Sequence, residues 1–113
     1  MKLPNADKAT IDPRKLAAYC LDAEHDDGRH KARLFRAAMG LGPEDAAALM
    51  ETLLQAIVED EVERMVETTF GVKYLLHHPI QGTDPPMALR HVWIVRHGED
   101  FPVLVTCFPE RVR

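Results

Sequence analysis

The spacing of the apolar residues changes in the middle of the chain, and this change constrains the fold more than any other feature. Before residue 59, apolar residues recur every three or four positions, as on one face of an α-helix. After it, they alternate with polar residues or run continuously, as in β-strands. The chain has 113 residues, which is the length of one domain. We therefore predict a single α+β domain over residues 1–113, with a helical half (1–58) and a sheet half (59–113).

About three helices are expected in the first half, over residues 12–20, 29–40 and 43–58. Asp12 is a good N-cap for the first, because its side chain can accept a hydrogen bond from the helix N-terminus. Gly40 is typical of the residue that ends a helix, since glycine adopts positive φ at little cost. These helices are predicted to pack together on one face of a sheet.

Four strands are expected in the second half, over about 61–67, 72–80, 89–97 and 103–108. The third contains the run Val-Trp-Ile-Val, which is apolar on both faces and therefore typical of a central strand. Short turns separate the strands along the chain, and short connections favour antiparallel pairing of consecutive strands. The predicted sheet is a four-stranded antiparallel meander.

The charges are unevenly distributed along the chain. The net charge is −4 and the pI is near 5.8, which argues against a non-specific nucleic-acid coat, whose pI is typically above about 9. Residues 29–36 nevertheless hold four bases, and residues 44–67 hold eight acids against the single base Arg64. The acids and the bases could therefore lie on different faces; the alternative is that both runs are solvated helix faces.

Signals for export and membrane insertion are missing from this sequence. The first residues lack the apolar core of a signal peptide, and no apolar run approaches the ~18 residues that span a bilayer. Cys20 and Cys107 are the two cysteines, and neither belongs to a C-x-x-C motif. We expect a cytoplasmic protein with two reduced thiols and no membrane association.

A run of titratable residues opens the second predicted helix. A helix N-terminus attracts phosphate, and Arg29, Lys31 and Arg33 would add positive charge there. His30 could exchange protons near neutral pH. Metal-free RNA cleavage needs a base for the 2′-hydroxyl, an acid for the 5′-oxygen and cations for the transition state. The alternative is a surface helix whose basic side chains pair with the acidic side chains of residues 22–27.

The remaining histidines give little indication of a metal site. His77 and His78 are adjacent and, in a strand, point to opposite faces. A zinc site from His91, His97 and Cys107 is conceivable, but no pair among them has an established ligand spacing. Gly-rich phosphate loops, G-x-S-x-G elbows and H-E-x-x-H motifs are also missing from this sequence. We expect no metal and no other cofactor.

Two residues of the predicted sheet carry polar or aromatic groups of interest. Thr106 is expected to lie among Leu104 and Phe108 on one apolar face, where a lone hydroxyl needs a hydrogen-bond partner. Trp93 is more typical of a core, although a partly exposed tryptophan on a sheet can stack on a nucleobase.

Five short motifs follow one another along the chain, and their order is informative. They are Lys2-Leu3-Pro4-Asn5-Ala6, Gly28-Arg29-His30-Lys31-Ala32-Arg33-Leu34-Phe35, Gly71-Val72-Lys73-Tyr74, Val92-Trp93-Ile94-Val95 and Leu104-Val105-Thr106-Cys107-Phe108-Pro109. In this order they resemble, over nearly the whole chain, a family of small, functionally uncharacterised bacterial proteins. Some of the motifs also resemble C-terminal domains of secreted polymorphic toxins. Those domains are similar in layout to the barnase/EndoU/colicin/RelE-like ribonucleases, which place helices before a four-stranded antiparallel sheet.

The resemblance implies roles for individual residues. His30 would move protons, Lys31 would hold phosphate, and Thr106 would bind a phosphate oxygen or orient His30. Tyr74 or Trp93 could stack on a base. Cys107 departs from the small or aliphatic residue expected at its place. The candidate substrate-binding residues are Arg29, Arg33, Lys73, Tyr74 and Trp93.

Two functions of different classes follow. The first is a metal-independent ribonuclease or toxin-like RNA-binding protein that acts with a neutralising partner; it predicts that His30, Lys31 and Thr106 converge in an open basic cleft. The second is a non-enzymatic interaction module, as the partner component of such a pair or as a homodimer. It predicts that His30 is packed or paired with Asp26 or Asp27, and that an exposed apolar strand edge dominates the surface.

Overall fold

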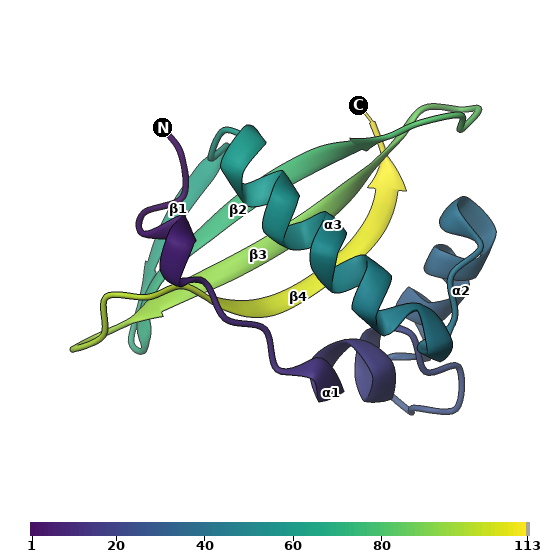
Figure 1. Ribbon diagram of the computed structural model, residues 1–113, viewed down its shortest axis with the longest axis horizontal. Helices are drawn as coiled ribbons and strands as arrows, with labels where there is room; N and C mark the ends of the chain where they lie inside the picture. Colours follow the sequence, from purple (N-terminus) through teal and green to yellow (C-terminus); the bar gives the residue numbers. More distant parts are fainter. Residues whose placement is uncertain (113) are drawn as a thin grey trace.

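The computed structural model describes residues 1–112 and has the predicted α+β architecture, in which the helices precede an antiparallel sheet (Figure 1). The strands pair in the order β1-β2-β3-β4, so each strand lies beside the next one along the chain. All three pairings are antiparallel, which confirms the predicted meander. The strands are β1 (Arg64–Thr68), β2 (Gly71–Ile80), β3 (Met87–Arg96) and β4 (Val103–Arg111).

The two long helices form where the apolar spacing predicts them. α2 (Arg29–Met39) ends at Gly40, whose φ of 69° is the left-handed conformation of a helix C-cap. α3 (Ala46–Glu59) follows a 3₁₀ turn at Pro43–Asp45. Within residues 1–112, none of the helices has the length and apolar character that crossing a bilayer requires.

The first predicted helix is shorter and more irregular than expected. α1 (Pro13–Lys15) is a single turn capped by Asp12, whose side chain accepts a hydrogen bond from the Arg14 backbone at 3.0 Å. The chain then continues as a π-helical turn, Leu16–Cys20. The i→i+5 spacing of this turn aligns Leu16 with both Cys20 and Leu21, and all three are at most 2% exposed. The core therefore receives three side chains from one short segment.

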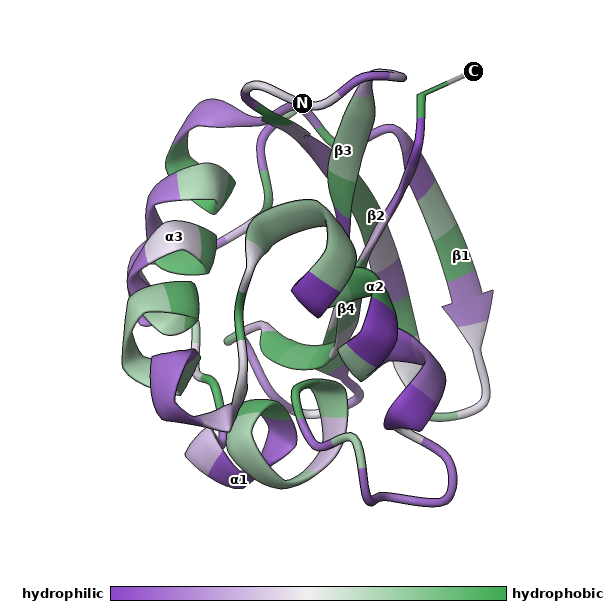
Figure 2. Cartoon of the chain, turned by 90° about the vertical axis from the view of Figure 1, so that its right-hand side faces the viewer, coloured by the Kyte–Doolittle hydropathy of each residue, from purple (hydrophilic) through white to green (hydrophobic). Residues whose placement is uncertain are grey.

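The hydrophobic core lies between α3 and one face of the sheet. In Figure 1, α3 crosses in front of the strands along this face. The helix contributes Leu49, Leu53 and Ile57, and β3 contributes Leu89 and Trp93; these five side chains are at most 1% exposed. Figure 2 shows α3 on one side of the sheet and α2 close to β4. The sheet face opposite α3 is called the outer face below.

A β-bulge in β4 separates Thr106 from Leu104, one of its two predicted neighbours, whereas Phe108 stays on the same face as Thr106. Thr106 pairs with Val92, but Leu104 pairs with Trp93, so Val105 is an extra residue between the two pairs. The extra residue shifts the side-chain alternation by one position. Leu104 therefore faces the core, whereas Thr106 lies on the outer face. The prediction that Thr106 and Leu104 share a face is wrong, because a period-two pattern does not reveal a single inserted residue.

Substitution of Gly71, the first residue of β2, tests how tightly β2 and β3 must approach. Its φ is 152°, and a Cβ at this position would lie 2.2 Å from the carbonyl oxygen of Val95. Gly71→Ala is expected to lower the free energy of unfolding by about 3 kcal/mol, measured by urea denaturation. Gly98→Ala is the matched control, because Gly98 also has positive φ (82°) but has no atom within 4 Å of a Cβ. It should cost only about 1 kcal/mol, and equal losses would contradict the steric argument.

Candidate functional site

The outer face of the sheet is hollowed along its length. Three hollows of about 360, 340 and 640 Å³ adjoin one another. The first and second share Arg90 as a lining residue, and the second and third share Lys73 and Val105. We call the three together the outer groove, and the 340 Å³ hollow its middle.

The outer groove is basic, although the chain as a whole is acidic. Its lining contains six cationic side chains and three carboxylates, with the histidines counted neutral, whereas the chain has a net charge of −4. Such segregated charge attracts an anionic ligand to one surface of an otherwise acidic protein. The charged lining residues are Lys15, Arg64, Lys73, Arg90, Arg96 and Arg111, with Glu63, Glu99 and Glu110.

Two polar atoms in the middle of the outer groove are buried without a hydrogen-bond partner. They are Nε of Arg90 and Oγ1 of Thr106, and no other buried side-chain nitrogen or oxygen in residues 1–112 lacks a partner. Buried polar groups are nearly always satisfied, so an unpartnered pair in one hollow requires a reason. An arginine donates and a threonine hydroxyl donates or accepts, and together they suit an oxyanion. The ion pair of Arg90 with Glu110 is long, at 3.9 Å, so it satisfies the guanidinium only weakly.

Lys31 reaches the outer face from α2. Its Nζ donates to the Tyr19 hydroxyl at 3.2 Å and lies 5.8 Å from the centre of the Phe108 ring. The guanidinium of Arg90 lies 5.6 Å from the same ring, so Phe108 contacts both cations. Lys31 and Thr106 also lie close to the Cys20 thiol. The structure thus groups Lys31, Arg90 and Thr106 around the outer side of β4.

The two cysteines adjoin each other beneath this group. Both are free and 0% exposed. The contact with the Cys107 thiol lowers the pKa of Cys20 to about 7, and the positive charge of Lys31 acts in the same direction. The contact with Cys20 and burial raise the pKa of Cys107. Both thiols therefore belong to the core and lie on the core side of Lys31, Arg90 and Thr106.

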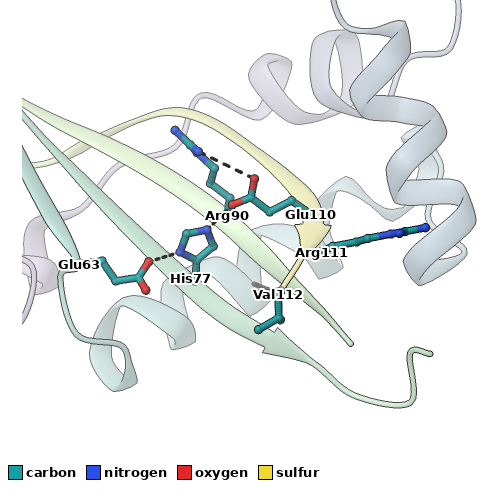
Figure 3. A pocket seen from close by; sticks show the side chains of 7 residues that line it. Glu63, His77, Arg90, Glu110, Arg111 and Val112 are labelled. Carbon is teal, nitrogen blue, oxygen red and sulfur yellow. Dashed lines mark hydrogen bonds and ion pairs between the residues drawn. The ribbon is translucent and has the colours of Figure 1, made fainter. Parts of the chain in front are cut away.

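His77 lies at one end of the outer groove, between two carboxylates (Figure 3). Its Nδ1 contacts Glu63 and its Nε2 contacts Glu110. Partial burial alone would lower the pKa of His77, but the two carboxylates together raise it above its ordinary value. A carboxylate at each ring nitrogen therefore favours the charged imidazolium form of His77.

A second histidine network lies on the core side of the sheet. Asp60 accepts from His78 Nδ1 and from His91 Nε2, both at 3.0 Å. Trp93 Nε1 can only donate, and it donates to His91 Nδ1 at 2.9 Å. The His91 proton is therefore on Nε2, and burial lowers the pKa of this ring despite the nearby carboxylate. This network ties the end of α3 to β2 and β3 and is separated from the outer groove by the sheet.

The predicted site residues fall into three groups. Lys73 and Thr106 line the outer groove, and Lys31 reaches its edge. Arg29 and His30 are exposed on the first turn of α2 and do not line the groove. Arg33 lines a separate hollow beside Leu21 and Leu41. Tyr74 and Trp93 are 7% and 0% exposed, so neither ring presents a face on which a base could stack.

Several residues of the outer groove were not predicted from the sequence. Arg90 is the neighbour of buried His91 on β3, and because successive strand residues face opposite sides, this predicts a basic side chain on the outer face. Glu63 and Glu110 had no such signal, because their meeting with His77 depends on strand register. Phe70, in the turn between β1 and β2, also lines the groove. Within residues 1–112, no group of three His, Cys, Asp or Glu side chains is arranged to hold a metal ion.

Comparison with known proteins indicates a family and a fold. Residues 2–111 match the family described as "Domain of unknown function (DUF6883)". A chain in the solved structure of a contact-dependent growth inhibition toxin–immunity protein complex from Klebsiella pneumoniae 342 has a similar fold, with a TM-score of 0.64 and 16% sequence identity. The match covers 88% of this chain and 98% of that chain. No curated protein matches the sequence.

Removal of the His77 ring tests the charged cluster in the outer groove. The folded-state pKa of His77 is raised above 6.5, so its ion pairs stabilise the fold fully below about pH 6.5, and this contribution is lost as the pH rises through the folded pKa. His77→Gln is therefore expected to lower the free energy of unfolding by about 1 kcal/mol at pH 5.5 and by less at pH 8.5. Urea denaturation at the two pH values measures both losses.

His97→Gln is the control, because His97 is exposed and its side chain makes no hydrogen bond within residues 1–112. It should change stability little at either pH. An equal loss for His77→Gln at pH 5.5 and pH 8.5 would mean that the ring packs as a neutral group.

Proposed function

This chain belongs to the DUF6883 family, and we propose that it is a metal-independent ribonuclease of the toxin type, which binds RNA in the outer groove and is neutralised by a partner protein. The observation that carries this proposal is the pair of buried, unpartnered atoms, Arg90 Nε and Thr106 Oγ1, in a basic groove. An RNA phosphate would supply the negative charge and the acceptor oxygens that these groups lack.

Binding of phosphate in this place would also serve catalysis. Cleavage of RNA through its 2′-hydroxyl builds negative charge on the phosphate oxygens, and cationic donors fixed around that charge lower the barrier. Lys31, Arg90 and Thr106 are grouped suitably for this role, and Lys73 lines the same hollow as Arg90 and Thr106. The arginine fork can bind two oxygens at once, which fixes the orientation of the phosphate.

His30 is the candidate for proton transfer. Four of the six histidines use their rings in hydrogen bonds within residues 1–112: His25, His77, His78 and His91. The His30 side chain makes no such bond in this part of the chain, and no ion pair with Asp26 or Asp27, which the interaction-module hypothesis expects. It precedes Lys31 directly on α2 but lies outside the lining of the outer groove, so the proposal requires the RNA to extend from the groove over the first turn of α2. In this proposal it takes the proton of the 2′-hydroxyl or returns one to the 5′-oxygen.

The fold comparison supports a role in a pair of a toxin and its neutralising partner. The similar chain belongs to a contact-dependent growth inhibition toxin–immunity protein complex. A nuclease that degrades RNA of its own cell has to be held inactive until delivery or release. We therefore propose a cognate partner protein for this chain that covers the outer groove or its edge.

A second candidate function is a non-enzymatic interaction module, the partner component of such a pair. It is favoured by β1, which is an edge strand and exposes Met65 by 52% and Val66 by 41%. An exposed apolar edge strand is a template for pairing with another chain. This function does not involve RNA and does not require Arg90 or Thr106 to bind a ligand.

Cleavage of RNA in the presence of EDTA separates the two functions. We expect the purified protein to cleave single-stranded or structured RNA, and His30→Ala to be slower by about 100-fold or more. Arg90→Gln should weaken RNA binding by about tenfold. Arg14→Gln is the matched control, since Arg14 is an exposed base that pairs only with Asp12, away from the groove, and it should behave as the parent.

Equal cleavage by the parent, His30→Ala and Arg90→Gln would place the activity elsewhere or in a contaminant. If the parent neither binds nor cleaves RNA, the interaction module becomes the better-supported function.

Thr106→Val tests whether the unpartnered hydroxyl is kept for a ligand. The variant keeps the shape of the side chain and removes a buried polar atom that has no partner. We expect the free energy of unfolding to rise by about 1 kcal/mol, while RNA binding and cleavage fall. Thr106→Ser, which keeps the hydroxyl, should retain binding. A Thr106→Val variant that is less stable than the parent would mean that the hydroxyl already has a partner in solution.

A further inference from the structure

The most exposed large apolar side chain of the protein is an aromatic ring at one end of the outer groove. Phe70 is 75% exposed in the turn between β1 and β2. The turn is nevertheless well ordered by hydrogen bonds: the Thr68 hydroxyl accepts from the backbone N–H groups of Phe70 and Gly71, both at 3.2 Å, and donates to the Gly71 carbonyl at 2.7 Å. The His97 backbone also donates to the Phe70 carbonyl at 3.1 Å. The ring is therefore presented to solvent from a fixed backbone.

Cationic side chains from three elements line the same hollow as this ring. Phe70 lines the 640 Å³ hollow together with Lys15 of α1, Lys73 of β2 and Arg96 of β3. The one carboxylate in this lining is Glu99, and it is paired with Arg96 at 3.7 Å. Apolar residues of the sheet complete the lining of the hollow, among them Ile94 and Val105. An aromatic face bordered by cations on an apolar floor matches the chemistry of a nucleotide, which joins a flat base to an anionic phosphate.

From this arrangement we infer that the Phe70 end of the outer groove is a subsite for an unpaired nucleobase, with Phe70 stacking on the base and Lys15 and Lys73 binding the adjacent phosphates. The inference rests on the proposed function and names its substrate class, which is single-stranded RNA or an unpaired loop. Paired bases are stacked on both sides by their neighbours and offer no face to a protein ring, whereas unpaired bases can turn outward.

The position of the subsite agrees with a strand of RNA that continues along the groove. Lys73 and Val105 line both this hollow and the middle hollow that contains Arg90 and Thr106. A base held at Phe70 would therefore fix the register of the phosphates that reach Arg90. Phe70 would replace Tyr74 and Trp93, the two buried rings, as the stacking residue.

The other possible occupant is a partner protein that uses Phe70 as an apolar anchor. The cations around the ring favour the nucleotide, because protein interfaces are depleted of charge around their apolar centres. Met65 of β1 is also apolar and exposed, but it does not share a hollow with these cations. It pairs with Tyr74 and lies on the opposite side of the sheet from the groove. Met65 thus provides a matched control for exposed apolar area alone.

The test is binding of a 12-nucleotide single-stranded RNA that carries one 2-aminopurine and 2′-O-methyl groups, which prevent cleavage. Emission of 2-aminopurine falls when the base stacks on an aromatic ring. We expect the parent to quench this emission on binding, and Phe70→Ala to bind about tenfold more weakly with less quenching. Phe70→Trp should restore binding, and Met65→Ala should bind as the parent. A duplex of the same sequence should bind the parent and Phe70→Ala equally.

Several outcomes would overturn the subsite, and they are distinct from failure of the proposed function. If Phe70→Ala binds the single strand as tightly as the parent, the ring does not hold a base, whether or not the parent cleaves RNA in EDTA. If Phe70→Ala weakens binding of the duplex as much as binding of the single strand, the ring does not select unpaired bases. If the parent neither binds nor cleaves RNA, the proposed function fails and the subsite fails with it. Thermal melting of Phe70→Ala and Phe70→Trp checks that both remain folded.

Discussion

One extra residue in β4 determines which side chains reach the outer groove. If β4 alternated regularly from Leu104 onward, its faces after the bulge would be exchanged: Cys107 would leave the core and Thr106 would enter it. The bulge at Val105 keeps Leu104 opposite Trp93 and Cys107 opposite His91, so the core stays closed on both sides of the irregularity. Bulges re-aim side chains at functional sites in this way, and the placement of Thr106 beside Arg90 and Lys31 depends on it.

The sheet separates the part of the protein that stabilises the fold from the part that is proposed to bind RNA. On the core side, Trp93, His91 and Asp60 satisfy one another's polar atoms beneath α3. On the outer side, Arg90 and Thr106 each retain an unsatisfied atom. An unsatisfied buried group costs about 1–3 kcal/mol, and the closed network on the other face makes that cost tolerable. A phosphate that satisfied both atoms would stabilise the folded state by mass action.

Much of the fold was predictable from the sequence, because apolar periodicity reports directly which face of an element is buried. The switch from period 3.6 to period 2 gave the order of α2, α3 and the four strands, and the doubly apolar run around Trp93 identified a central strand. The bulge was not predictable, since it depends on the fit of two strands rather than on composition. The irregular first helix was missed for a related reason: Asp12 indicates a helix start but says nothing of a π-helical turn.

The candidate site was predictable only where one residue carried its own signal. Thr106 was expected to carry a hydroxyl that needs a partner, and Lys31 was a candidate phosphate-binding cation; the structure places both at the outer side of β4. Arg90, His77 and Phe70 matter because of what strand pairing places beside them, and pairing register is not visible in one sequence. The acidic pI does not reveal this basic lining, for the same reason: the six cations of the outer groove come from α1 and from all four strands, and not from one run of sequence. A charge summed over the chain therefore says little about the charge that a ligand meets on this one face.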